Sequence, residues 1–430
     1  MNRLFTKLIR LVTAALLLAP VLCYSAGQQQ VAAALDCDRL VHVHCGKTPS
    51  AVMTSGQQLW VVFVQQEHVY FTTSDDLGAS YSPAVAINKQ PEKIYSNGEN
   101  RAKVAIGKRG EVLVSWSKNT QGKFTGDIRF SRSVNGGKSF ESPFTVNNDG
   151  LLATHRFDSL QVTPSGKIYL AWIDKRDRVA AIKNDNSYTG AALYYAVSSD
   201  GGVSFPDNYK VADSSCECCR IAIAAHGDDE VAVLWRHIFP GSIRDHAAGI
   251  LKPKGYSFYQ RATVDNWQIN ACPHHGPDMI QATNTAANSS TNTSINTTIK
   301  SPVAGDSNHS SRYHIVWFSN GDDHQGIYYA LQDFATGEQS QLYRIDDQAS
   351  ASHPQLAQRG NRLYIVWKIF DGEKTHIRLI VSEDHGQSFV DKGEVLSTRA
   401  GSDHPLLIEA NDGVYLSWHT SEQGYRVEAL

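Results

Sequence analysis

A short apolar run with an aromatic residue near its end recurs seven times along this chain of 430 residues. The runs are QLWVVFV, EVLVSWS, KIYLAWI, EVAVLWR, YHIVWFS, RLYIVWK and GVYLSWH. Aligned, they place the following residues in one column, at intervals of 53, 56, 63, 82, 50 and 51 residues: Phe63, Trp116, Trp172, Trp235, Trp317, Trp367 and Trp418. Their β-branched and aromatic content is typical of strands, and the period indicates one supersecondary unit repeated along the chain.

A second element follows several of these runs. It reads SDDLGASY (74–81), SVNGGKSF (133–140), SSDGGVSF (198–205) and SEDHGQSF (382–389), and LKPKGYSF (251–258) keeps only its second half. The Asp or Asn can bond the turn backbone and the glycine accepts a positive φ, so this box predicts a tight hairpin turn. Each repeat then holds four short strands, with almost no helical periodicity. The sequence therefore predicts an all-β chain that forms a seven-bladed β-propeller of four-stranded antiparallel blades.

The last repeat has room for only one strand after Trp418, the segment YRVEAL. The N-terminal segment RLVHVH resembles the final strands of other blades, so we expect it to complete the seventh blade and close the ring. Six blades with an extra sheet is the alternative. The propeller would span residues 38–430, with a polar insertion rich in Asn, Thr and Ser at 283–312 that accounts for the longest interval.

The four complete boxes resemble the Asp-box (BNR) repeats of the sialidase-like β-propeller superfamily, and the repeat covers nearly all of the chain after its N-terminus. The resemblance implies the fold. It does not imply the activity, because in that superfamily the boxes lie in turns on the face opposite the usual ligand site. Sialidases hold the substrate carboxylate with an arginine triad and use a Tyr-Glu nucleophile pair. This sequence has no Arg-Ile-Pro type motif for the first arginine, and no tyrosine nucleophile can be assigned.

The N-terminus predicts export. Residues 1–26 carry Arg3, Lys7 and Arg10 ahead of an apolar run at 11–22 and then small residues, which is the pattern of a signal peptide. The run is shorter than the ~20 residues of a spanning helix. We therefore expect a periplasmic or secreted protein without a membrane span. The formal net charge of −3 and the lack of a basic run indicate no nucleic-acid partner and leave a metal ion or a small molecule as the ligand. The oligomeric state stays open.

Six cysteines follow the predicted signal peptide. Cys37 and Cys45 are a plausible disulfide pair in an exported protein. The other four lie in two segments, SSCECCRIA (214–222) and ACPHHGPDM (271–279), which carry Cys216, Cys218, Cys219, Cys272, His274 and His275. Counting back 12 to 18 residues from each Trp finds the start of a blade's first strand, which lines the channel. This places the first segment at the channel mouth. The insertion prevents the same counting for the second, which we assign to the start of the next blade.

Thiolate and imidazole are the ligands of copper and zinc, so the two segments predict a soft-metal site, with copper favoured over zinc. Met279 could add a thioether. In an extended strand Cys216 and Cys218 point one way and Cys219 the other, so one ion would require the segment to bend. The alternative is a set of disulfides, with Cys219–Cys272 joining two blades.

Other residues fall at or near the starts of channel-lining strands and are candidate outer ligands or substrate-binding groups: Arg101, His155, Arg156, Asp158, Arg220, His353 and His404. The three arginines begin successive blades and could together hold an acidic ligand. Three functions remain open: metal binding, handling or metal-dependent redox chemistry; an exo-sialidase type glycoside hydrolase that binds acidic sugars; and a non-enzymatic scaffold with disulfides. No catalytic residue is assigned.

Overall fold

The computed structural model describes residues 35–282, 311–321 and 324–430. The predicted signal peptide at 1–26 and nearly all of the polar insertion at 283–312 lie outside the described residues. In the part of the chain that is described, no helix is long and apolar enough to cross a membrane.

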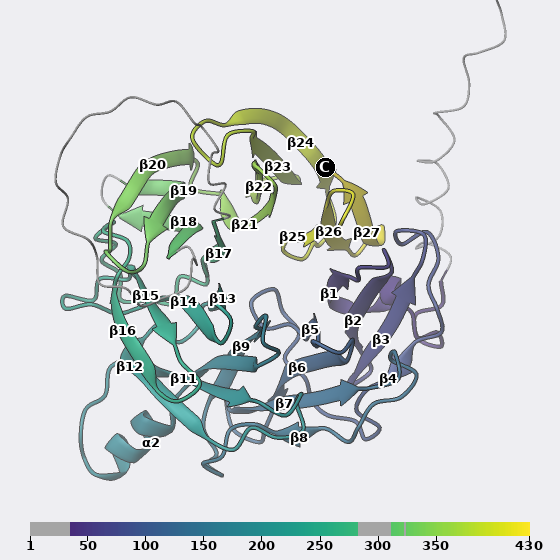
Figure 1. The fold of residues 1–430 in the computed structure, drawn as a ribbon, viewed down its shortest axis with the longest axis horizontal. Coiled ribbons are helices and arrows are strands. Elements are labelled where there is room, and N and C mark those ends of the chain that lie inside the picture. The colour runs from purple at the N-terminus through teal and green to yellow at the C-terminus, as the bar shows by residue number, and fades with distance from the viewer. Residues whose placement is uncertain (1–34, 283–310, 322–323) are drawn as a thin grey trace, which may run out of the picture.

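Seven antiparallel sheets form a ring, which confirms the seven-bladed β-propeller (Figure 1). The first strands of the blades are innermost and pack against one another around the channel: β1 (Lys47–Met53), β5 (Lys103–Ile106), β9 (His155–Val162), β13 (Ala222–His226), β17 (Asp278–Gln281), β21 (Ser352–Arg359) and β25 (Leu406–Glu409). The second strands carry the repeated aromatic column: β2 (Leu59–Gln65), β6 (Val112–Asn119), β10 (Ile168–Asp174), β14 (Glu230–Arg236), β18 (Arg312–Gly321), β22 (Arg362–Phe370) and β26 (Val414–Thr420).

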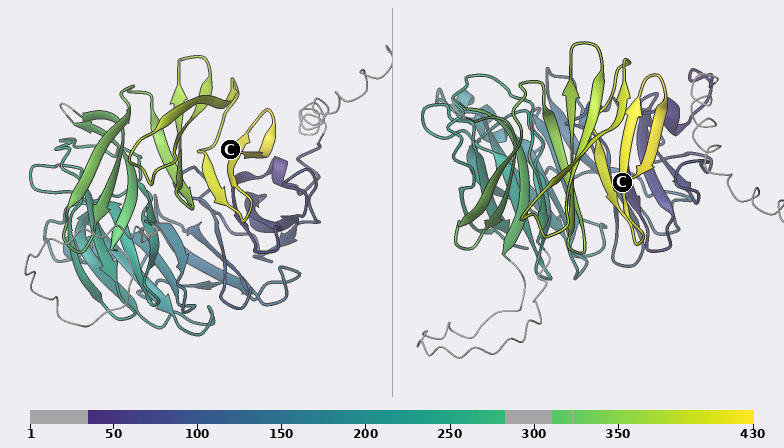
Figure 2. Two further views of the ribbon diagram at one scale, coloured as in Figure 1. Left: turned by 45° about the horizontal axis from the view of Figure 1, so that its top comes forward. Right: turned by 90° about the horizontal axis from the view of Figure 1, so that it is seen from above.

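The third strands follow outward: β3 (His68–Ser74), β7 (Gly126–Ser133), β11 (Ala191–Ser198), β15 (His246–Leu251), β19 (His324–Asp333), β23 (Thr375–Ser382) and β27 (Gly424–Ala429). The fourth strands form the outer edge: β4 (Val85–Ala86), β8 (Phe144–Thr145), β12 (Asn208–Ser215), β16 (Tyr256–Arg261), β20 (Gln339–Asp346) and β24 (Val390–Thr398). Two short helices accompany them, η2 (Val43–Cys45) and α2 (Arg176–Lys183). Figure 2 shows the blades from two further directions.

The core lies between neighbouring blades. Trp317 on β18, for example, packs with Ala232 and Leu234 of the preceding blade. Because each second strand has a sheet on both sides, all seven residues of β10 are buried, and such a strand reads as a nearly continuous apolar run. The same burial explains the recurring run in the sequence. Truncation of one buried tryptophan would cost about 3–5 kcal/mol.

The boxes form the expected turns between third and fourth strands. In the third blade the Ser198 hydroxyl donates to Asp200 Oδ1 at 2.6 Å and accepts from the Gly202 N–H at 2.9 Å, and the Ser204 hydroxyl donates to Asp200 Oδ2 at 2.6 Å. The same serine-to-glycine and serine-to-Asp/Asn bonds recur in the first, second and sixth blades. These turns lie at the strand ends opposite the segments that carry the cysteines.

The closing segment differs from the sequence expectation. The seventh sheet has three strands, and the expected fourth strand, RLVHVH, instead contains helix η2. Cys37 and Cys45 form the predicted disulfide, and their Cα atoms are 5.3 Å apart. Eight extended residues would separate them by about 26 Å, so this disulfide prevents a strand here. The segment still joins the ring ends, because the Tyr425 N–H donates to His44 Nδ1 at 3.1 Å.

Candidate functional site

The turn between β12 and β13 brings three cysteines together. The backbone turns at Glu217 and Cys218, and β13 begins only at Ala222, so the segment precedes the channel strand instead of starting it. The sulfur atoms of Cys216, Cys218 and Cys219 lie 3.7, 3.7 and 3.9 Å from one another. All three side chains are buried. The turn therefore provides the bend that an extended strand lacks.

Cys272 reaches the same cluster from the loop between β16 and β17. Its interaction with the Cys218 thiol lowers the pKa of Cys272. The Cys272 sulfur is not among the three that all lie within 4.8 Å of one another. Unlike the other three, Cys272 is exposed. We call these four residues the thiol cluster: Cys216, Cys218, Cys219 and Cys272. The cluster joins the fourth and fifth blades, with one thiol open to solvent.

Three buried arginines adjoin the thiol cluster. Arg236, Arg244 and Arg156 are 1%, 8% and 9% exposed. The hydrogen bonds of Arg236 and Arg244 go to backbone carbonyl oxygens, and Arg156 lies over the Tyr95 ring at 3.8 Å. Within the described ranges none of the three forms an ion pair with a carboxylate. Because buried charges are normally paired, these guanidinium groups indicate an anion nearby.

The thiols are the groups that can supply this negative charge. Hydrogen bonds from its two neighbouring thiols hold the pKa of Cys216 well below its usual range, and the charges of Arg236 and Arg244 act in the same direction. Arg156 interacts electrostatically with Cys218. By contrast, hydrogen bonds with Cys216 and Cys219 raise the pKa of the Cys218 thiol, and burial raises the pKa of the Cys219 thiol. The environment thus favours ionised sulfur at part of the cluster.

Glu217, which stands between the first two cysteines, points toward helix α2. Its carboxylate accepts hydrogen bonds from Lys175, just before the helix, and from Arg178 within it. These two ion pairs tie the turn to the outer part of the neighbouring blade. They hold the backbone of the turn without using a thiol.

Four further residues from four blades form a second group, which we call the imidazole cluster: Glu99, His275, His353 and His404. The His353 and His404 rings stack with their centroids 3.4 Å apart. Glu99 Oε1 lies 3.5 Å from His353 Nε2 and 3.8 Å from His404 Nδ1. The His275 ring lies 5.0 Å from that of His353. The structure therefore groups His275 with these channel residues.

Burial and nearby cations keep these imidazoles neutral. Burial, followed by the charges of Arg236 and Arg220, lowers the pKa of His275 to about 3. Burial also lowers the pKa of His353 and of His404 well below the usual value. A neutral imidazole keeps a lone pair on one nitrogen, so each ring can act as a ligand.

The three arginines at the blade starts each have separate partners. Arg101 pairs with Asp403 at 2.9 Å. The Arg220 N–H donates to Glu99 Oε2 at 2.7 Å, and its guanidinium donates to two proline carbonyl oxygens. Arg156 lies on an aromatic ring, as described above. The structure does not present the three guanidinium groups as one free triad.

Two other predicted rim residues link neighbouring blades. His155 is fully buried, with its ring nitrogens 2.7 Å from the Gly126 carbonyl oxygen and 3.0 Å from Asp149 Oδ2. Asp158 accepts hydrogen bonds from Lys103 and from two serine hydroxyls of the second blade.

The remaining predicted residues of the second segment separate. His274 is exposed, with φ +57. Met279 is buried in the core between the fourth and fifth blades, so its thioether packs there.

Glu99, Arg236 and Arg244 were not predicted as site residues. Glu99 stands two positions before Arg101 in GENRAKV, and a carboxylate beside a predicted rim residue was the available signal. Arg236 ends the run EVAVLWR, where a charge follows five buried strand residues. Arg244 carries no such signal, because it lies in an irregular loop.

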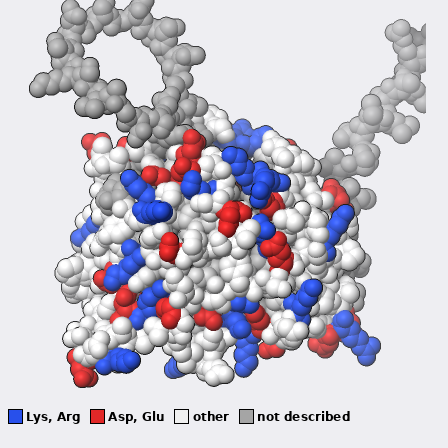
Figure 3. Space-filling model, turned by 60° about the horizontal axis from the view of Figure 1, so that its bottom comes forward, with Lys and Arg blue, Asp and Glu red and all other residues white. Residues whose placement is uncertain are grey.

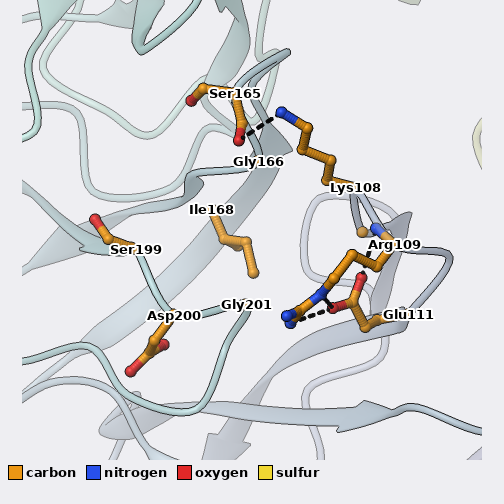
Figure 4. Close-up of a pocket in the computed structure, with 10 residues that line it drawn as sticks. Lys108, Arg109, Glu111, Ser165, Gly166, Ile168, Ser199, Asp200 and Gly201 are labelled. Atoms are coloured by element: carbon orange, nitrogen blue, oxygen red, sulfur yellow. Dashed lines mark hydrogen bonds and ion pairs between the residues drawn. The ribbon is translucent and has the colours of Figure 1, made fainter.

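The opposite end of the strands carries a shallow pocket (Figure 4). Three of its charged groups already have hydrogen-bond partners: Lys108 Nζ donates to the Ser165 carbonyl oxygen at 3.2 Å, and Arg109 Nε donates to Glu111 Oε1 at 2.8 Å. The face seen in Figure 3 has basic and acidic side chains interspersed, so its charge is mixed. The two clusters at the channel mouth remain the chemically distinctive groups.

No protein-family model and no curated protein matches this sequence. Solved structures do match. A polysaccharide lyase of family PL25, an ulvan lyase, is 10% identical with a TM-score of 0.53, covering 89% of this chain and 92% of its own. The NanB sialidase from Streptococcus pneumoniae is 10% identical with a TM-score of 0.45, over 76% of this chain and 65% of its own. An α-L-arabinanase from Penicillium chrysogenum is 12% identical with a TM-score of 0.46, over 77% and 90%. At these identities the likeness is one of fold alone, and the lyase match, with its TM-score above 0.5, carries it.

Proposed function

We propose that this propeller is an exported, periplasmic or secreted, metal-binding protein whose thiol cluster holds one soft ion, Cu(I) or Zn(II). The observation that carries the proposal is the spacing of the sulfur atoms. Thiolates bound to a tetrahedral ion at about 2.3 Å lie about 3.8 Å from one another. The three measured separations are 3.7, 3.7 and 3.9 Å. We assign the fourth ligand position to Cys272, whose thiol interacts with that of Cys218.

The charges around the cluster support the same assignment. Four thiolates with Zn(II), or three with Cu(I), carry a net charge of −2. Arg156, Arg236 and Arg244 are buried without carboxylate partners in the described chain, and they would neutralise such a complex. A set of neutral thiols or disulfides would leave these three cations without an ion-pair partner in the described chain.

The other two readings of the sequence receive less support. A sialidase-type site needs arginines free to hold a carboxylate, whereas Arg101 is paired with Asp403 and the Arg220 guanidinium donates to carbonyl oxygens. A disulfide scaffold needs bonded pairs, whereas Cys216, Cys218 and Cys219 are spaced like ligands. Export is supported by the N-terminal pattern at 1–26 and by the Cys37–Cys45 disulfide.

Elemental analysis and thiol counting on protein from its native compartment test the proposal. We expect one equivalent of copper or zinc, no alkylated thiols in the native protein, and four after unfolding with a chelator. Cys219→Ser and Cys272→Ser should each lose the metal, and the matched control Cys37→Ser/Cys45→Ser should retain it. Metal-free protein without alkylatable thiols after unfolding would overturn the proposal, since the cysteines would then be disulfides. The element found decides between copper and zinc.

A further inference from the structure

We infer that the imidazole cluster of Glu99, His275, His353 and His404 is a second metal site at the channel mouth, which takes a divalent transition-metal ion of borderline softness. The inference does not depend on the thiol cluster, because the two sites use different ligand types. Carboxylate and imidazole together suit Zn(II), Cu(II) and Co(II).

The first observation is that four buried polar atoms in this cluster have no hydrogen-bond partner. They are Glu99 Oε1 and the Nδ1 atoms of His275, His353 and His404. Glu99 itself is only 6% exposed. Buried polar atoms are almost always satisfied, and an unsatisfied one costs roughly 1–3 kcal/mol. Four such atoms gathered in one group indicate that a ligand binds among these side chains, with His353 facing Glu99 through its other nitrogen, Nε2.

The second observation is the separation of the potential ligand atoms. Glu99, His353 and His404 each offer an atom within 4.8 Å of the others. The separations of 3.5 and 3.8 Å between Glu99 Oε1 and the two rings are too long for hydrogen bonds. Ligands at about 2.0–2.1 Å around a tetrahedral ion lie about 3.3–3.4 Å apart. The Glu99 oxygen and each of these two imidazole nitrogens would approach by a few tenths of an ångström around an ion.

Backbone contacts hold the ligands in this arrangement. The Arg220 N–H fixes Glu99 by binding its other oxygen, Oε2, at 2.7 Å. Arg236 donates to the His275 carbonyl oxygen at 3.0 Å. His353 lies in a β-bulge with φ +52, an unfavourable conformation for a residue with a side chain. Such supporting contacts orient the ligands of metal sites.

The cations near the imidazole cluster affect how tightly it is expected to bind a divalent ion. The charges of Arg101, Lys368 and Arg220 act on the His404 ring and would oppose a second positive ion. The single carboxylate, Glu99, also supplies less negative charge than four thiolates do. We therefore expect the imidazole cluster to bind a divalent ion more weakly than the thiol cluster does.

Titration of metal-free, reduced full-length protein with Co(II) tests the inference. Cobalt bound by thiolates gives intense charge-transfer absorption, whereas cobalt bound by imidazole and carboxylate gives only weak ligand-field bands. We expect the first equivalent of Co(II) to give charge-transfer absorption and the second to give only ligand-field bands. His353→Ala/His404→Ala should lose the second equivalent and keep the first, and Glu99→Gln should weaken the second at least tenfold. The control His376→Ala, at a surface His between two carboxylates, should keep both.

The outcomes separate the two sites. A second equivalent that persists in His353→Ala/His404→Ala, or is absent from the wild-type chain, would overturn the inference and leave the thiol site standing. The wild-type protein could instead bind one Co(II) that gives only ligand-field bands, with no charge-transfer absorption. If His353→Ala/His404→Ala loses that Co(II), the imidazole site is supported and the thiol site is refuted.

Discussion

Asp149→Asn tests whether His155 holds two blades together or serves the channel. Asp149 Oδ2 lies 3.0 Å from His155 Nε2, and the imidazole is fully buried. Burial opposes the charge on both groups, but their hydrogen bond and mutual attraction outweigh it. The pKa of His155 is therefore raised, and that of Asp149 is lowered from 3.8 to about 2.

The magnitude follows from the Asp149 carboxyl. Lowering its pKa from 3.8 to about 2 corresponds to about 2 kcal/mol of folding free energy. This contribution is complete above pH 3.8, the unfolded value, and is lost as the pH falls toward 2. The raised pKa of His155 adds stability that is complete below its unfolded value of 6.5 and is lost as the pH rises through the folded value. The pair therefore contributes most between about pH 4 and 6.5.

Urea unfolding at pH 5.5 and at pH 9 measures this contribution. At pH 5.5 we expect Asp149→Asn to lower the free energy of unfolding by about 2 kcal/mol. The difference should shrink at pH 9, because His155 loses its charge as the pH rises through its folded pKa, and metal content should not change. Asp371→Asn, which breaks an exposed Asp-His pair, is the control and should have little effect. A loss of stability that is equal at both pH values, or a loss of metal, would refute the assignment.

Three further predictions concern the thiol cluster, a blade contact and a box turn. Arg236→Gln should weaken metal binding about 10–100-fold in chelator competition, and Arg236→Lys, which keeps the charge, should weaken it less; equal losses would contradict a role for charge. Asp158→Ala should lower the free energy of unfolding in urea by about 3 kcal/mol, because it leaves the largely buried Lys103 unpaired, and should spare the metal. Gly202→Ala should lower the melting temperature more than Gly136→Ala, since both have positive φ but only the Gly202 Cβ would meet an aromatic ring, at 2.8 Å; equal shifts would argue against the clash.

The ring of blades could be predicted because one physical constraint repeats. Every second strand is covered on both faces, so each blade leaves an apolar run around a buried aromatic residue, such as Trp172 on β10. The box turns repeat for a similar reason, since Gly202 at φ +84 needs the same residue type in each copy. The closing segment could not be predicted from such a pattern. A single disulfide, Cys37–Cys45, determines it against the strand-like sequence.

The site was predicted in part because every blade starts at the same end of the ring. This common position of the blade starts predicted that the segments with Cys216 and Cys272 lie near each other. Register does not determine which way a side chain points, and β9 shows why. A β-bulge at Phe157, with φ +59, breaks the alternation of the strand, and Asp158 turns toward Ser115 and Ser117 of the second blade. Counting from the tryptophans treats such a residue as if it faced the channel.

The separation of the predicted site into two clusters follows from how short its loops are. Cys219 and Arg220 are adjacent, yet one thiol joins the thiol cluster while the next N–H binds Glu99 of the imidazole cluster. In the same way, Cys272 belongs to the thiol cluster and His275 to the imidazole cluster. These two residues are three positions apart, a distance that an extended chain spans in at most about 11 Å. Two loops thus contribute to both clusters, which must lie close together at the channel mouth.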